Sequence, residues 1–266
     1  RGCEAITVGH LLTHYSGLPA GHTWNPEHPP ASLQAYATTI GEAGPELEPG
    51  SRFWYSDAGA DVLGAVLEVA AGESLERLLP SRVLKPLVMN DTGYLRARSG
   101  GGETPPPRGA GVEDFLRDLP ISRVSALYGG SRGQWQRFWA PGEESLYPFP
   151  LGSQGVYSTP LDYARFLSVW LDREGPGRTI LSEESLAAIL DPVAPMTVPG
   201  TASPVSTALP GLEVWHGEMS MLWREEGSGP IQVVGYSGSD GTFAWAWPGE
   251  GLMVLFFSQS RGQDVQ

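Results

Sequence analysis

Apolar residues recur three and four positions apart between Asp57 and Gly72, which is the spacing of one face of an α-helix. Gly72 predicts the C-terminal end of this helix, because glycine readily takes the left-handed conformation found there. The apolar face that the spacing predicts consists of Ala58, Val62, Leu63, Val66, Leu67 and Ala70.

Capping residues and prolines predict further helices on both sides of this one. Thr7 is a good N-cap before VGHLLTH, and Thr159 with Pro160 opens a helix through LDYARFLSVWLD. Pro80 should bend or restart the helix that contains it. The other predicted helices are 33–39, 74–85 and 182–190.

Runs of β-branched and aromatic residues, separated by Gly-rich turns, fill the end of the chain. They predict an antiparallel meander with both faces largely covered. Phe243, Trp245 and Trp247 alternate with smaller residues, so we expect them in the core rather than on a ligand platform. One more strand is predicted over 121–128. The runs of the meander are GEMSMLWRE (217–225), IQVVGYSG (231–238), GTFAWAWP (241–248) and GLMVLFFSQS (251–260).

A helical middle followed by strands predicts an α+β fold. Region 1–211 is expected to be mostly helical, with long Gly- and Pro-rich loops at 97–111 and 192–211. Region 212–266 is expected to hold the antiparallel strands. We predict that the two regions form one intertwined domain.

Composition narrows the possible partners. The 266 residues carry a net charge of −13, which argues against nucleic acid or an anionic membrane as partner. Apolar residues make up 41% of the chain and no run of 18 is apolar, so no membrane segment is expected. A single cysteine, Cys3, excludes an internal disulfide and a zinc–cysteine cluster.

Tyr55 is the most informative residue, because it lies in a Tyr-Ser-Asp turn that opens the 57–72 helix. That setting suits a phenol that transfers a proton. The 266 residues contain no Ser-Xaa-Xaa-Lys pair, and Lys85 is the only lysine.

Five segments, in order, resemble the serine β-lactamase-related hydrolases, the relatives of class C β-lactamases, D-Ala-D-Ala carboxypeptidases and family VIII esterases. The resemblance implies the penicillin-recognising fold, in which an antiparallel sheet is flanked by helices and a helical subdomain. The segments are ITVGHLLTHYSGLP (6–19), PGSRFWYSDAGADVLGAVLEVAAGESLERLL (49–79), LKPLVMNDTGY (84–94), GSQGVYSTPLDYARF (152–166) and VGYSGSDGTFAWAWPGEGLMVLFFSQSRG (234–262).

The resemblance also implies hydrolysis of an ester or amide through an acyl-serine intermediate, without metal or organic cofactor. The nucleophile of the family lies in a Ser-Xaa-Xaa-Lys turn ahead of the segment that 6–19 matches. We therefore expect this chain to be an internal piece of a longer protein that lacks the N-terminal strands and the nucleophile helix, and to be inactive alone. A periplasmic or extracellular location and a small ester, amide or β-lactam substrate are implied as well.

Tyr55, Ser56 and Asp57 match the family's Tyr-Xaa-Asn motif. By resemblance, Tyr55 is the general base of acylation and the acid for the leaving group. A free phenol has a pKa near 10, and a neighbouring ammonium would lower it. Lys85 matches a structural segment, so we do not expect it to supply that ammonium. Asp57 replaces the usual Asn, which removes an amide donor but makes a good helix cap.

Tyr236, Ser237 and Gly238 match a strand-borne Lys/His-Ser/Thr-Gly motif that binds substrate. Tyr236 carries no cation for a substrate carboxylate, which favours a neutral ester. Gly238 should let the substrate backbone approach the strand. The N–H of Ser239 is the implied half of the oxyanion hole on this chain.

Two other functions stay open from the sequence. One is a binding protein of the penicillin-recognising fold that performs no chemistry. The other is an α/β-hydrolase that uses Ser131, because GGSRG (129–133) fits the nucleophile-elbow pattern. That pattern needs a following helix, and QWQRFWAPG is short and broken by proline, so a surface turn is the better interpretation.

The histidines give weaker signals. His10 and His14 are four apart, as helical metal ligands can be, but their segment matches a packing segment of the family. His22, His28 and His216 show no partner pattern and are predicted as exposed loop residues.

Overall fold

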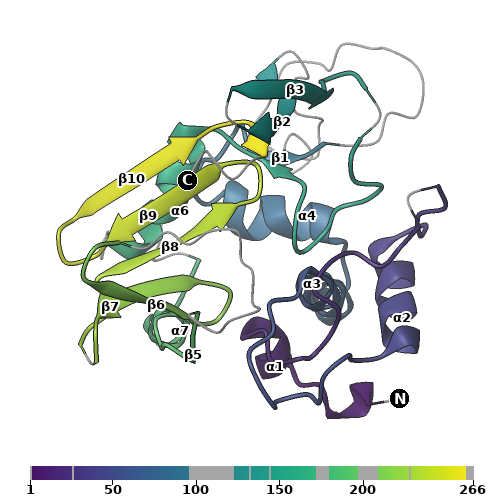
Figure 1. Cartoon of the computed structure of the whole chain (residues 1–266), viewed down its shortest axis with the longest axis horizontal. Helices are drawn as coiled ribbons and strands as arrows, with labels where there is room; N and C mark the ends of the chain where they lie inside the picture. Colours follow the sequence, from purple (N-terminus) through teal and green to yellow (C-terminus); the bar gives the residue numbers. More distant parts are fainter. Residues whose placement is uncertain are drawn as a thin grey trace. The chain divides into compact units, whose positions relative to one another are not determined.

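The computed structural model describes residues 2–25, 27–95, 123–131, 133–143, 145–171, 180–196, 209–227 and 229–261. The chain divides into two compact units, which we describe separately (Figure 1). Unit 1 comprises Arg1–Arg82, Gly93–Asp118 and Glu144–Tyr157. Unit 2 comprises Val83–Thr92, Leu119–Glu143 and Ser158–Gln266. The predicted loop at 97–111 lies wholly outside the described ranges, and so does most of the predicted loop at 192–211.

Helices are the main regular elements of the described part of unit 1. The Thr7 side chain accepts a hydrogen bond from the His10 N–H at 3.1 Å and caps α1, as predicted. The weak stretch near 33–39 forms a longer helix, α2, whose inner face buries Leu33, Tyr36 and Ile40. The remaining elements are the 3-10 helix Cys3–Ala5, α1 (Val8–Leu12), α2 (Leu33–Ala43), α3 (Asp57–Ala71), α4 (Leu75–Leu79) and the short pair β1 (Gly93–Tyr94) and β4 (Val156–Tyr157).

Helix α3 has the predicted bounds but not the predicted buried face. It ends at Gly72, which is left-handed with φ 69° as expected. Val66 and Leu67, predicted as core, are 37% and 48% exposed. Burial is concentrated in the first half of the helix, on Ala58, Gly59, Ala60, Asp61, Leu63, Gly64 and Ala65. Small residues therefore form the packed surface, because they let neighbouring backbone approach the helix closely.

Pro80 restarts the next helix, as predicted. Helix α4 ends at Leu79 because proline has no N–H for the next α-helical bond. The chain then continues as a single π-helical turn, η2 (Pro80–Leu84).

A six-stranded antiparallel sheet in the order β10-β9-β8-β7-β6-β5 organises unit 2. Strands β7 to β10 are the predicted meander. Strands β5 and β6 were not predicted, and β5 falls inside the expected loop at 192–211. The strands are β5 (Ala194–Pro195), β6 (Leu212–His216), β7 (Met221–Glu225), β8 (Val233–Gly238), β9 (Thr242–Trp247) and β10 (Leu252–Phe257).

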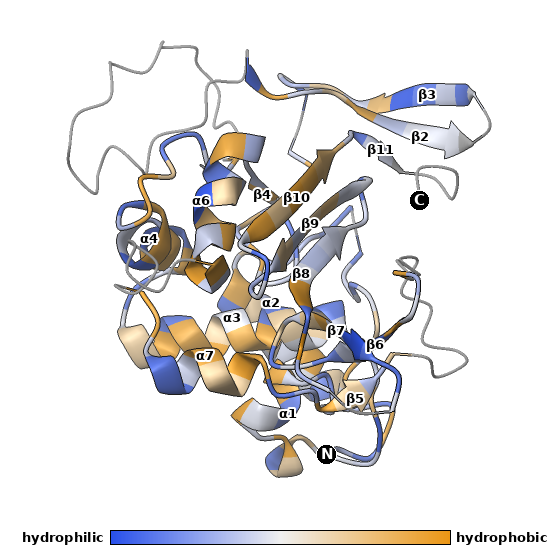
Figure 2. Cartoon of the chain, turned by 90° about the vertical axis from the view of Figure 1, so that its left-hand side faces the viewer, coloured by the Kyte–Doolittle hydropathy of each residue, from blue (hydrophilic) through white to orange (hydrophobic). Residues whose placement is uncertain are grey.

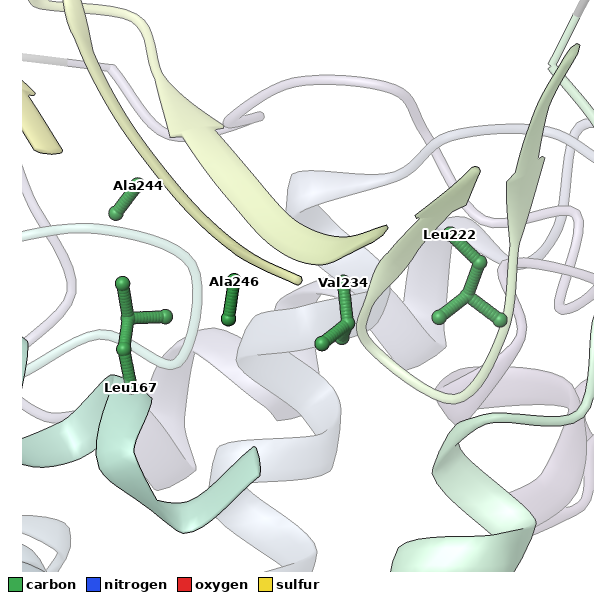
Figure 3. Close-up of a cluster of buried hydrophobic side chains, with 5 residues drawn as sticks. All are labelled: Leu167, Leu222, Val234, Ala244 and Ala246. Atoms are coloured by element: carbon green, nitrogen blue, oxygen red, sulfur yellow. The ribbon is translucent and has the colours of Figure 1, made fainter. Parts of the chain in front are cut away.

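One face of this sheet packs on α6 (Pro160–Leu171), the helix that Thr159 caps as predicted. Leu167 of α6 lies against the small side chains of Ala244 and Ala246 (Figure 3). Leu222 and Val234 extend the same buried cluster along the sheet. The predicted helix near 182–190 is α7 (Glu183–Ile189), capped by Ser182.

The other face of the sheet is partly open, which corrects the prediction that both faces are covered. In the described part of the chain, Leu252, Val254 and Phe256 of β10 are between 38% and 51% exposed. They pair with Trp247, Trp245 and Phe243 of β9, which are half-buried. Trp245 and Trp247 pack against a buried cluster of β7 and β8. Strand β10 is correspondingly apolar along its length in Figure 2.

A second sheet of unit 2 has the order β11-β2-β3. The strand expected over 121–128 begins only at Leu127, so β2 is Leu127–Ser131 and includes the glycines that were assigned to a turn. It forms a hairpin with β3 (Gln134–Trp139), and β11 (Ser260–Arg261) pairs with β2 in parallel. Because a strand and not a helix follows Ser131, the nucleophile-elbow interpretation of GGSRG is wrong.

Candidate active site

In unit 1, Tyr55 lies in an extended turn that is fixed at the start of α3. Its neighbour Ser56 is buried and caps the helix, with Oγ accepting from the Gly59 N–H at 2.7 Å. The same hydroxyl donates to the Pro19 carbonyl at 2.7 Å. One serine thus joins the turn both to the helix and to the preceding loop, which restricts the position of Tyr55.

His14 supports the turn from beneath, a role that the sequence did not reveal. Its ring centroid lies 4.6 Å from that of Tyr55, and its Nδ1 accepts from the Ser56 N–H at 3.2 Å. His14 is buried and has a left-handed backbone, with φ 57°. The imidazole is therefore part of the wall against which the Tyr55 phenol packs.

The Tyr55 hydroxyl acts on the Asp57 carboxylate and lowers the pKa of that carboxyl. Asp57 also accepts from Gln154 Nε2 at 3.3 Å. Burial raises the pKa of the Asp57 carboxyl, while His22 and the Tyr55 hydrogen bond act in the opposite direction. The structure thus brings together two predicted residues, Tyr55 and Asp57, and adds Gln154 from the loop before β4.

A second carboxylate, Asp61, lies one turn further along α3 and is completely buried. It accepts from the Ser153 N–H at 3.0 Å, and its Oδ2 is 3.4 Å from His22 Nε2. His22 also stacks on Trp24 with ring centroids 4.3 Å apart, so the prediction of an exposed, unpartnered His22 is wrong. His22 Nε2 contacts Ser153 Oγ at 3.3 Å as well.

These three side chains do not form a Ser-His-Asp catalytic triad. In a triad the carboxylate and the serine contact different nitrogens of the imidazole. Here Asp61 and Ser153 both approach Nε2 of His22. The group is instead suited to holding the loop that carries Ser153 and Gln154 against α3.

Gly152 permits this loop to lie on the helix, which gives a testable prediction. A Cβ at Gly152 would lie 2.2 Å from the Ala60 carbonyl oxygen. We expect Gly152→Ala to lower the free energy of unfolding by about 1–3 kcal/mol, because rigid backbone cannot yield to it. Urea unfolding measures the change.

The matched control is Gly41→Ala in α2, where an added Cβ meets no atom within 4 Å. We expect this variant to gain about 0.5–1 kcal/mol from the higher helix propensity of alanine. Equal effects of the two substitutions would contradict the assigned role of Gly152.

In unit 2, Tyr236 points its hydroxyl at a buried histidine. Tyr236 Oη lies 3.3 Å from His216 Nε2, and His216 Nδ1 lies 2.7 Å from the Gly217 carbonyl oxygen. A carbonyl can only accept, so Nδ1 carries the proton and Nε2 accepts from the phenol. His216 thus orients the phenol of Tyr236 near the end of β8.

His216 corrects the prediction of an exposed loop histidine. It is the last residue of β6, is fully buried, and burial lowers its pKa to about 4. In the sequence, the alternation of Leu212, Val214 and His216 is the signal that could have indicated a strand here. An imidazole therefore supports the position where the family pattern has His or Lys.

The two residues after Tyr236 have different environments. Ser237 Oγ is a buried atom, and it has no hydrogen-bond partner within the described residues. Gly238 is needed by the sheet itself, since a Cβ there would lie 2.4 Å from Thr242 Oγ1. Ser239 follows as an exposed residue of the β8–β9 turn. The structure thus places the four predicted residues in sequence at one strand end.

The other residues considered for chemistry, Lys85 and His10, belong neither to the residues around Tyr55 nor to those around Tyr236. Lys85 is exposed at the end of η2. His10 caps α1 through its Nδ1, 3.4 Å from the Thr7 N–H. Across the described ranges, no three His, Cys, Asp or Glu side chains gather in a way that could hold a metal ion. Among the same residues, no helix is long and apolar enough to cross a membrane.

Comparisons with known proteins agree on one family and one fold. The family model described as Beta-lactamase matches residues 1–266. A putative D-alanyl-D-alanine carboxypeptidase of Salmonella paratyphi B is 25% identical over 202 residues, which are 71% of this chain and 44% of that protein. The chain thus spans less than half the length of this relative.

Solved structures resemble the chain over nearly its whole length. The penicillin binding protein from Bacillus halodurans has a TM-score of 0.67 at 20% identity, covering 97% of this chain and 69% of that one. EstCE1, a hydrolase with promiscuous acyltransferase activity, has a TM-score of 0.67 at 19% identity, covering 95% and 66%. At these identities the likeness shows the fold alone. The predicted α+β penicillin-recognising fold is confirmed.

Proposed function

This chain belongs to the Beta-lactamase family of serine hydrolases, and from that membership we propose that it carries the acid–base and oxyanion groups of an acyl-serine hydrolase. The substrate is a small ester or amide. The fixed Tyr55 turn at the start of α3 is the observation that carries the proposal.

Tyr55 is the proposed general base of acylation and the acid for the leaving group. Its ring packs on His14, and its hydroxyl acts on Asp57 and lowers the pKa of that carboxyl, which supports a defined position for the phenol before substrate binds. A base that is already oriented avoids the cost of ordering it in the transition state. Asp57 is the proposed positioning residue for that hydroxyl.

Ser237 and Ser239 are the residues proposed to contact the substrate. The buried hydroxyl of Ser237 supports a role in binding a polar group of the substrate, because such atoms are normally satisfied. The N–H of Ser239 is the proposed oxyanion donor. Tyr236 brings a neutral phenol, supported by His216, where a cation would select a carboxylate. This supports a neutral ester or amide over a D-alanyl carboxylate or a β-lactam.

The nucleophile is proposed to lie in a Ser-Xaa-Xaa-Lys turn that the 266 residues do not contain. We therefore expect the chain alone to show no steady hydrolysis of a chromogenic short-chain ester or of a cephalosporin above a Tyr55→Phe control. The full-length gene product should hydrolyse the ester, and mass spectrometry should find the acyl group on the serine of its Ser-Xaa-Xaa-Lys.

Two outcomes would overturn the proposal. Steady turnover by the chain alone would show that its nucleophile lies within these residues. A full-length product without Ser-Xaa-Xaa-Lys, and without an acyl adduct, would favour a binding protein of the same fold. A periplasmic or extracellular location is proposed on the same family resemblance, and cell fractionation of the full-length product tests it.

A further inference from the structure

A hollow of about 260 Å³ opens between the β2–β3 hairpin and the residues that follow β10. All of its described lining belongs to unit 2. Four side chains line it, namely Tyr128, Trp135, Gln259 and Ser260. None of the residues discussed so far as acid, base or oxyanion donor is among them.

The register of the hairpin explains why the hollow exists. Trp135 lies opposite Gly130, and Tyr128 is two residues before Gly130 on the same strand face. Gly130 has no side chain to fill the space beside the two rings. Its φ of 146° and the 2.1 Å that would separate a Cβ from the Gln134 carbonyl oxygen keep this position as glycine. The strand register therefore places Tyr128 and Trp135 beside a position that must remain glycine.

Backbone hydrogen bonds connect residues that line the hollow to one another and to the β8–β9 turn. The Tyr128 N–H donates to the Gln259 carbonyl at 2.9 Å, and the Ser260 N–H donates to the Asp240 carbonyl at 3.0 Å. Asp240 is the residue after Ser239 in the β8–β9 turn. The hollow thus adjoins the turn that bears the proposed oxyanion donor.

The lining is aromatic and neutral, which limits the ligand chemistry. The two rings offer faces or edges to another ring, and the Gln259 amide and Ser260 hydroxyl offer uncharged hydrogen bonds. Among the described residues, Arg137 lies opposite Tyr128 and is engaged with Glu143 at 3.4 Å. Ligand pockets commonly combine such apolar walls with a few polar groups.

We propose that this hollow binds an uncharged aromatic group of the substrate, on either side of the ester or amide that is cleaved. The inference rests on the proposed function for its place in the reaction, but the binding step needs no turnover. Trp135 is the specificity-determining residue and Tyr128 is the second wall.

The test uses the full 266-residue chain labelled with ¹⁵N, and follows the indole N–H signal of Trp135. That signal is identified by its loss in Trp135→Phe. The probes are N-benzylacetamide, its saturated counterpart N-(cyclohexylmethyl)acetamide, and methyl β-D-glucopyranoside. We expect the benzyl amide to shift the Trp135 signal in a saturable way and to bind about fivefold more tightly than the cyclohexyl amide.

Variants then locate the binding by calorimetry. Trp135→Ala should weaken benzyl amide binding about fivefold, whereas Trp135→Phe, which keeps a ring, should retain it. Phe138→Ala is the matched control, because Phe138 is as exposed as Tyr128, at 42%, but alternates to the other face of the hairpin. Retained binding in Trp135→Phe also shows that the hairpin tolerates substitution.

Several results would overturn the proposal. They are equal affinity for the two amides, a saturable shift with the glucoside instead, no saturable shift at all, or equal weakening by Phe138→Ala. The outcome is separable from catalysis. If the proposed hydrolase function fails, the full-length product forms no acyl adduct, yet the benzyl amide titration still saturates.

Discussion

In the full-length gene product, Tyr55→Phe should lower kcat/KM for a chromogenic ester by about 10²–10⁴-fold, the usual contribution of a positioned general acid–base group. Phenylalanine keeps the ring that packs on His14 at 4.6 Å, so the turn should survive. Only the hydroxyl, which lowers the pKa of Asp57, is removed. Steady-state kinetics across pH measure the loss.

Tyr15→Phe is the matched control, because Tyr15 also packs on an aromatic ring, with Phe53 at 6.4 Å, and lies outside the proposed chemistry. It should leave kcat/KM within about twofold of the parent, as expected for a substitution away from the reacting atoms. A Tyr55→Phe enzyme with parental kcat/KM would remove Tyr55 from the mechanism. Asp57→Ala tests positioning separately, since removal of the carboxylate should lower kcat more than it raises KM.

Acidification to about pH 4 should cost the protein about 3 kcal/mol through His216 alone, because the histidine pKa is about 4 in the fold against 6.5 when unfolded. As pH falls below 6.5, the unfolded chain takes up the proton first, and unfolding becomes easier. The stability is fully present above pH 6.5 and is lost as pH falls through the folded pKa of about 4. Above that window His216 contributes no pH dependence.

Urea unfolding at a series of pH values measures this effect as a difference between the parent and His216→Gln. The difference is needed because Asp57, whose pKa is raised by burial, acts with the opposite sign in acid. His28→Gln, the same substitution at an exposed histidine, is the control. Parallel curves for the parent and His216→Gln would show that His216 does not titrate as its burial implies.

The helices were predictable because their signals are local. Thr7 and Thr159, the predicted caps, each accept a backbone N–H three residues further on. At α3 the cap is Ser56 and not Asp57, which was predicted as the cap and is the first residue of the helix. Gly72 and Pro80 act through their own backbone. Such signals do not depend on what the helix packs against.

Burial was predicted less well than the element bounds. Leu67 on α3 and Phe256 on β10 have the periodicity of buried residues but are 48% and 42% exposed. Periodicity reports which residues share a face, whereas burial depends on what packs against that face. The same reasoning applies to Trp245, which was expected in the core and is half-buried.

Strand pairing was the other limit of the sequence. β6 was missed because its five residues, LEVWH, include two polar ones, and only pairing with β7 and β5 defines it as a strand. The hairpin of β2 and β3 was missed because its glycines favour turns in isolation. Neither β6 nor the β2–β3 hairpin has a strong local sequence signal, because a strand is stabilised by its cross-strand partners.

The sequence by itself determined the family, the Tyr55 turn and the strand end at Tyr236, because each depends on an ordered run of neighbouring residues. The tertiary structure alone decided that His14 and Asp57 hold Tyr55, that His216 holds Tyr236, and that Asp61 joins His22. Most of these contacts join residues that are far apart in the chain. The distance between two residues in the sequence and the periodicity of each element do not predict which side chains meet when the elements pack. The aromatic hollow has the same origin, since Trp135 and Gln259 become neighbours only when β11 pairs with β2.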